Sequence, residues 1–75
     1  MTIDQLLQPI LKTKEPLRTD DTPQTRPEWD SFAHVNMIAT LEDTLGVELN
    51  TTEVVSLTSV ADVIAICKAH GLNLN

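Results

Sequence analysis

The chain has 75 residues, a formal net charge of −6 and a hydrophobic content of 41%. A chain of this length forms one domain, residues 1–75, whose core is too thin for a deep substrate pocket, so a self-contained enzyme is not expected. Residues 28–75 hold seven acidic residues and one basic residue, which excludes nucleic acids and anionic membranes as partners and favours basic proteins.

The first predicted helix covers Thr2 to Leu11, with Thr2 as its N-cap. Ile3, Leu6, Leu7 and Ile10 fall on one stripe of this helix. Pro9 lies on the opposite side and removes a backbone donor, so a kink or an early stop is expected there. Residues 12–27 follow as a long loop that contains three prolines and one large apolar residue.

The second predicted helix runs from Ser31 to Leu45, capped by Asp30 or Ser31 and followed by Gly46 in a left-handed conformation. Helical periodicity places five residues on its core stripe: His34, Met37, Ile38, Leu41 and Leu45. Phe32 and Val35 fall on the outer face together with Asn36, Ala39, Glu42 and Asp43. The two acids stand near the C-terminal end of the helix, where the dipole disfavours negative charge, so a docking face for a basic partner competes with simple solubility as their role.

Two further helices complete the predicted fold. A short one covers Thr51 to Ser56, opened by a capping box between Asn50 and Glu53. A longer one covers Ser59 to His70, capped by Thr58 or Ser59 and ended by Gly71. The prediction is therefore an all-α fold, a small four-helix bundle of three longer helices and one short helix, with a long loop between the first two.

One pattern extends over about residues 28–70. It consists of the run Trp29-Asp30-Ser31-Phe32, the amphipathic helix after it, Gly46, and Leu57-Thr58-Ser59-Val60 before the last helix. This pattern resembles that of the acyl carrier proteins. In that family the serine of an Asp-Ser-Leu motif accepts 4'-phosphopantetheine from coenzyme A, and here that position is Ser31. A helix N-terminus suits such a phosphate because its free backbone N–H groups favour an anion.

The resemblance implies a carrier that performs no bond chemistry itself and holds an acyl or aminoacyl group as a thioester on the arm of Ser31. Its expected partners are a phosphopantetheinyl transferase and acyl-processing or ligase enzymes with basic docking patches. The residues expected to dock them are Trp29, Asp30, Phe32, Val35, Glu42 and Asp43. Ile38, Leu41, Val54 and Leu57 are the residues expected to line a site for the carried chain.

The departures from the family pattern bear on the pathway. Ala33 and Asn36 occupy positions that are often acidic in the carriers of fatty acid synthases, and Phe32 replaces the usual leucine. Trp29 before Asp-Ser is more like carriers of specialised metabolism. The resemblance therefore implies a polyketide or related pathway rather than primary fatty acid synthesis.

Other interpretations of single residues remain open. Trp29 either shields the arm and touches partners or fixes the loop onto the bundle. Ser31 and His34 together could serve as the catalytic pair of a minimal serine hydrolase, although the helix pattern favours a position for His34 at the edge of the core. Cys67 and His70 lack the further ligands that zinc needs, so no metal site is expected and Cys67 is predicted to be packed in the core.

The remaining alternative is a small acidic helical interaction module without a prosthetic group. No stretch of the chain is apolar over the length of a membrane span, and one cysteine fits a reducing compartment, so a cytoplasmic monomer is expected.

Overall fold

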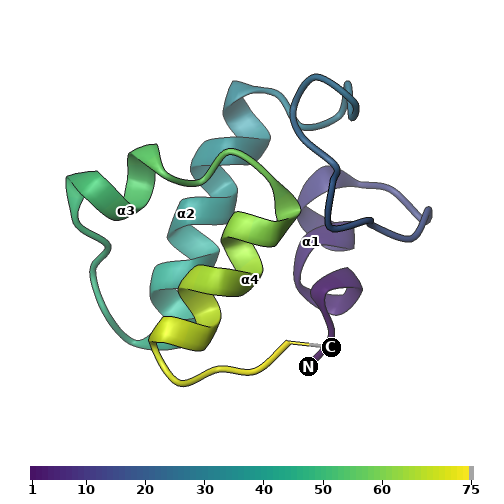
Figure 1. The fold of residues 1–75 in the computed structure, drawn as a ribbon. Coiled ribbons are helices and arrows are strands. Elements are labelled where there is room, and N and C mark those ends of the chain that lie inside the picture. Colours follow the sequence, from purple (N-terminus) through teal and green to yellow (C-terminus); the bar gives the residue numbers. More distant parts are fainter. Residues whose placement is uncertain (75) are drawn as a thin grey trace.

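The computed structural model describes residues 1–74, which form four α-helices and no strand. The helices are α1 (Ile3–Leu11), α2 (Ser31–Leu45), α3 (Thr51–Val55) and α4 (Val60–Ala69). Figure 1 shows α1, α2 and α4 grouped together, with the short α3 at one side. The predicted all-α bundle of three longer helices and one short helix is confirmed.

The core is built by α1, α2 and α4, with contributions from the segments that precede α2 and α4. Its most deeply buried side chains are Leu7, Met37, Leu41, Val60, Val63 and Cys67. Burial of Cys67 was predicted, and it raises the pKa of the thiol because the surrounding apolar atoms disfavour the thiolate. None of the residues of α3 is buried, so α3 adds little to the core.

α1 begins as predicted and passes through its proline. The Thr2 hydroxyl accepts a hydrogen bond from the Gln5 N–H at 3.0 Å, and the Gln5 side chain accepts one from the Thr2 N–H at 2.8 Å. The early stop expected at Pro9 does not occur, because the helix continues to Leu11 with Pro9 on its exposed side. Lys12 caps the C-terminal end of the helix, and its φ of 54° lies in the left-handed region that usually favours glycine.

α2 presents the predicted stripe to the core, with one addition. Met37 and Leu41 are buried, whereas His34, Ile38 and Leu45 are only partly buried. Ala33, which is not among the five predicted stripe residues, is buried as well, so the inward face is rotated about the helix axis toward Ala33. Gly46 follows with a φ of 69°, as predicted for the residue that ends the helix.

Of the two helices at the C-terminal end, α3 begins at the predicted Thr51, and α4 begins at Val60, one residue after its predicted start. Asn50 and Glu53 form the reciprocal capping box of α3, and the Ser59 hydroxyl caps α4 by accepting from the Asp62 N–H. α4 ends at Ala69, one residue earlier than predicted. His70 instead lies 2.6 Å from a Glu53 carboxylate oxygen through its Nε2 and so links the end of α4 to α3.

The segment between α1 and α2 is irregular, as predicted, but it is tightly organised around Arg26. This side chain is buried and bonds to the Asp21 carboxylate through Nε at 3.0 Å and Nη2 at 2.9 Å. It also donates to the Pro16 carbonyl and lies within 3.6 Å of a Glu28 carboxylate oxygen. Because both Arg26 and Asp21 are buried, their ion pair fixes the path of the loop across the bundle.

That course places two loop carbonyls at the start of α4. The Val60 N–H donates to the Asp21 carbonyl and the Ala61 N–H donates to the Thr19 carbonyl, both at 3.0 Å. The first N–H groups of a helix have no partner within the helix, so the loop satisfies donors that would otherwise be left unpaired. The loop thereby connects the region before α2 to α4.

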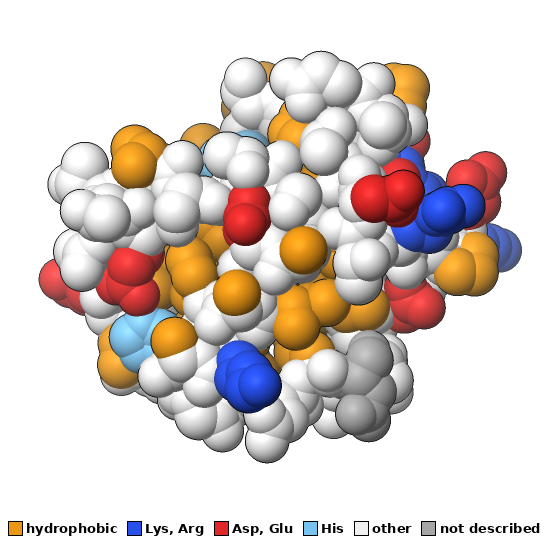
Figure 2. All heavy atoms as spheres, viewed as in Figure 1, with side chains coloured by type: hydrophobic (Ala, Val, Ile, Leu, Met, Phe, Trp, Pro, Cys, Tyr) orange, Lys and Arg blue, Asp and Glu red, His pale blue; other side chains and the backbone are white. Residues whose placement is uncertain are grey.

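Within residues 1–74, no helix is long and apolar enough to cross a membrane. Figure 2 shows that the basic side chains visible on one face gather mainly over the loop between α1 and α2, whereas the acids are more widely distributed.

Candidate functional site

Ser31 is the first residue of α2 and is exposed to solvent. The preceding Asp30 is the N-cap, and its carboxylate accepts a hydrogen bond from the Ala33 N–H at 2.9 Å. Of the two candidate caps, the structure therefore selects Asp30. This choice matters because a serine that caps its own helix has its hydroxyl engaged with the backbone, whereas Ser31 does not cap.

The surroundings of Ser31 leave several polar groups available. Among residues 1–74, no protein group is hydrogen bonded to the Ser31 hydroxyl, and the N–H groups of Ser31 and Phe32 donate to no carbonyl within the helix because they lie at its start. The positive end of the α2 dipole lies at the same place. The site can therefore present a nucleophilic oxygen to another molecule and accommodate a phosphate on it.

Trp29 is held beside this site by His34. The indole Nε1–H of Trp29 donates to Nδ1 of His34 at 3.1 Å, and the two rings stack with centroids 6.3 Å apart. Trp29 is only 2% exposed. Of its two predicted roles, the structure favours fixing the loop to the bundle. Its role among the docking residues stays a prediction.

The same hydrogen bond determines what His34 can do. Its Nδ1 is occupied by Trp29, and among residues 1–74 no hydrogen bond joins His34 to Ser31. The arrangement does not form the serine–histidine pair that a hydrolase would use. His34 is partly buried at the edge of the core, as its position on the helix stripe predicted.

A pocket of about 380 Å³ opens beside Ser31. It is called the Ser31 pocket here and is lined by Pro23, Trp29, Asp30, Ser31, His34 and Val35. A smaller cavity of about 240 Å³ also borders Ser31 and is lined by Ser31, Phe32, Val35 and Asn36. Pro23 could not be predicted as part of this pocket, because only the course of the loop brings it to α2.

The predicted docking residues on α2 differ in how freely they are exposed. Phe32 is 85% exposed and Val35 is 64% exposed, which matches their predicted outer face. Asp43 is exposed, whereas Glu42 is partly buried and its carboxylate accepts from the Leu49 N–H at 2.9 Å. Glu42 therefore stabilises the turn after α2, a contact that the helix pattern alone could not indicate.

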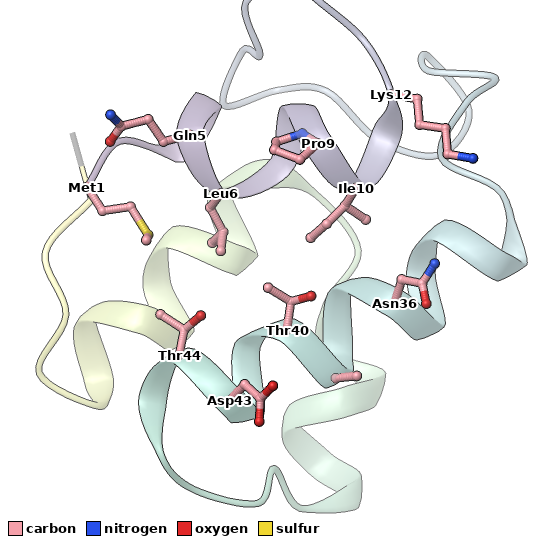
Figure 3. A pocket seen from close by; sticks show the side chains of 11 residues that line it. Met1, Gln5, Leu6, Pro9, Ile10, Lys12, Asn36, Thr40, Asp43 and Thr44 are labelled. Carbon is pink, nitrogen blue, oxygen red and sulfur yellow. The ribbon is translucent and has the colours of Figure 1, made fainter.

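Asp43 borders a further cavity, of about 510 Å³, between α1 and α2. Figure 3 shows Asn36, Thr40, Asp43 and Thr44 on α2 facing Leu6, Pro9 and Ile10 on α1 across this cavity. The polar residues of α2 meet the apolar residues of α1 there. Part of the outer face of α2 therefore lines a cavity that α1 also lines.

The four residues expected around a carried chain come from α2, α3 and the turn that follows α3. Leu41 and Leu57 are buried in the core, and Ile38 and Val54 are partly buried. The cavities beside Ser31 and between α1 and α2 are lined by other residues. Leu41 and Leu57 belong to the core and Ile38 packs against it, whereas Val54 on α3 does not, and the role of all four toward a carried chain stays a prediction.

The described residues contain no group of three or more histidine, cysteine, aspartate or glutamate side chains arranged to hold a metal ion. His70, one of the two residues considered as ligands, is paired with Glu53 instead. Glu53 has its pKa lowered, chiefly by that hydrogen bond.

No protein-family model matches the chain, and no curated protein sequence matches it. The fold is similar to a solved structure from Mycobacterium tuberculosis described as "a putative acyl carrier protein", with a TM-score of 0.79 and 21% sequence identity. The similarity covers 89% of this chain and 90% of that one. The chain therefore has the four-helix fold of that protein.

Proposed function

We propose that this chain is an acyl carrier protein whose Ser31 carries a 4'-phosphopantetheine arm. The observation that supports it most is the exposed Ser31 at the first position of α2, with its hydroxyl unengaged and Asp30 serving as the cap. The similarity of the fold to a protein described as an acyl carrier supports the same function. The arm would hold an acyl or aminoacyl group as a thioester and present it to successive enzymes at high effective concentration.

Attachment of the arm requires coenzyme A and a separate transferase. The Ser31 oxygen forms a bond to the phosphorus on the pantetheine side of the diphosphate, and adenosine 3',5'-bisphosphate leaves as the P–O bond breaks. The hydroxyl proton passes to a base of the transferase. This chain contributes the nucleophile and the helix end that receives the phosphate, so it needs no general base of its own.

The proposal is tested by intact mass measurement after incubation with a promiscuous phosphopantetheinyl transferase, Mg²⁺ and coenzyme A. We expect one discrete increase of one phosphopantetheine, abolished in Ser31→Ala. Ser56→Ala is the matched control, because Ser56 is also exposed but ends α3 with its hydroxyl bonded to the Glu53 carbonyl. Modification of Ser31→Ala at another residue would refute the assignment of the site.

A polyketide or related pathway is proposed over primary fatty acid synthesis. Ala33, at a position that is often acidic in fatty acid synthase carriers, is buried against the core, so a carboxylate there would be costly. The holo protein is expected to be acylated faster by an acyltransferase of a polyketide synthase than by one of a fatty acid synthase. Equal or reversed rates would remove this preference.

A second candidate is an interaction module without a prosthetic group. The exposed pair Phe32 and Val35 favours it, because large apolar side chains on an otherwise polar helix face are typical of a binding surface. The mass measurement separates the two functions, since such a module would gain nothing from the transferase. Loading at Ser31 would leave Phe32 and Val35 as part of the surface that meets the transferase and later enzymes.

A further inference from the structure

We propose that the Ser31 pocket receives the part of the arm nearest to Ser31, and that His34 holds it there through its Nε2–H. This inference rests on the proposed function, because it concerns the arm that Ser31 would carry. Ser31 and His34 are three residues apart on α2, so their side chains lie on one face of the helix. Both line the same pocket of about 380 Å³.

Trp29 determines which nitrogen of His34 carries the proton. An indole N–H can only donate, so Nδ1 of His34, 3.1 Å away, must accept and must be unprotonated. The proton of the neutral ring is then on Nε2. Since Trp29 is 2% exposed and stacks on His34, the imidazole is held in a fixed orientation before any ligand arrives.

The lining of the pocket matches the chemistry of a phosphopantetheine arm. Near its attachment point the arm has oxygen acceptors, followed by a carbon bearing two methyl groups. His34 supplies a donor for an oxygen, while Trp29, Val35 and Pro23 supply apolar surface for the methyl groups. The smaller cavity beside Ser31, formed with Phe32, Val35 and Asn36, has no ring donor and no buried aromatic wall.

One charged group in the pocket opposes an anion. Asp30 lines the pocket, and its carboxylate would repel the phosphodiester on Ser31. One of its oxygens, however, is bonded to the Ala33 N–H, and the free N–H groups at the start of α2 lie beside Ser31. A donor on His34 is therefore useful, because it gives the arm an attractive contact in the same pocket.

The test uses the wild-type protein loaded with coenzyme A that carries ¹³C in the two methyl groups, with loading confirmed by intact mass. We expect nuclear Overhauser contacts from these methyl protons to the ring protons of Trp29 and His34. We also expect ¹⁵N spectra with the proton on Nε2 of His34 before and after loading, and a change in the Nε2 shift on loading. This part needs no substitution, so it does not depend on how a variant folds.

Variants then assign the contact to His34. In loaded His34→Ala the contacts to Trp29 are expected to be lost, and His34→Gln, which keeps a polar side chain able to accept from Trp29, should restore part of them. Asn36→Ala is the matched control, because Asn36 is on the same helix and lines only the other cavities. Methyl contacts to Phe32 and Asn36, or none at all in the loaded wild type, would overturn the pocket assignment alone, whereas failure to load Ser31 would overturn the proposed function and this inference with it.

Discussion

Arg26 is the side chain on which the long loop depends. Its guanidinium and the Asp21 carboxylate are both buried, and the Asp21 backbone carbonyl in turn accepts from the first N–H of α4. A buried ion pair is weak evidence for net stability, but removing one partner leaves a charge without compensation. Breaking this pair should therefore lower the free energy of unfolding more than breaking any surface ion pair in the molecule would.

We expect Arg26→Ala to lower the free energy of unfolding by about 3–5 kcal/mol, because Asp21 would remain buried without its partner. For a domain of this size that approaches the whole stability. Arg18→Ala is the control, since the Arg18 and Asp20 side chains are 76% and 73% exposed and their pair should matter little. Urea unfolding of the three proteins measures the difference; similar midpoints for the two variants would show that the pair does not hold the loop.

The same pair makes stability depend on pH. The hydrogen bond from Arg26 is the main reason that the pKa of Asp21 is lowered, and the Thr58 hydroxyl does the same for Asp62. A carboxyl whose pKa is lower in the folded state stabilises the fold above its unfolded pKa, and this stabilisation is lost as pH falls through the folded pKa. Stability should therefore decline below about pH 4.

Asp21→Asn should flatten part of this acid decline while lowering stability at pH 7. Urea midpoints measured between neutral pH and the acid range would show it. An unchanged acid slope in Asp21→Asn would mean that other carboxyls govern the decline.

The contacts of some single residues could be predicted from the sequence, and those of others could not. The caps Thr2, Asn50 and Ser59 and the buried Cys67 were predictable, because they depend on neighbours within a few positions. The bond between Trp29 and His34 was not, because it requires the path of a loop that has no periodicity. Arg26 appeared in the sequence only as one of several charges that cancel.

At the scale of elements, α3 is held differently from the other helices. It buries none of its five residues, so capping at its start and the contact between Glu53 and His70 are the described interactions that fix it. The helix length and the capping box could be predicted from residues 50–56. The link to His70 could not, since it joins residues 17 positions apart.

We expect His70→Ala to loosen α3 selectively. Amide hydrogen exchange in α3 should become faster, while exchange in α1 should remain unchanged, because local opening depends on local contacts. Lys68→Ala is the matched control, since Lys68 is exposed in the last turn of α4, close to His70 in the chain. Equal exchange in α3 for the two variants would show that the capping box alone holds it.

The orientation of α2 can be tested by three alanine substitutions. Leu41→Ala should cost about 2–5 kcal/mol of unfolding free energy, because Leu41 is fully buried. Ile38→Ala should cost less than Leu41→Ala, since Ile38 is only partly buried, and Phe32→Ala should cost least because Phe32 is 85% exposed. Thermal or urea melts give the order, and a Phe32→Ala variant less stable than the other two would reverse the assigned inward face.

At the scale of the whole molecule, charge is distributed so that the longer part of the chain, which contains Ser31, is strongly acidic. Residues 28–75 carry seven acids and one base, while the bases of the first 27 residues balance their acids. A field of one sign accelerates encounter with a surface of the opposite sign and does little for the fold. This balance could be read from the sequence alone, but the exposed acids suited to docking could not, because Glu42 is engaged with the Leu49 backbone.

Asp43 is therefore the better position to test docking to a basic partner. Asp43→Lys should leave the fold intact and even stabilise it slightly, because a cation suits the C-terminal end of α2. The rate of Ser31 modification by the transferase should fall several-fold at low salt, mainly through a slower association, and the difference from the wild type should shrink as salt is added.

Asp20→Lys makes the same change in net charge on the loop between α1 and α2, where the Asp20 side chain is 73% exposed. If both variants slow modification equally, the partner senses the overall charge of the molecule rather than the face of α2. If only Asp43→Lys slows it, the encounter is directed to the side of α2 that continues toward Phe32 and Ser31. Equal rates for all three proteins at low salt, with each folded by circular dichroism, would assign these acids to solubility and leave docking to the apolar pair Phe32 and Val35.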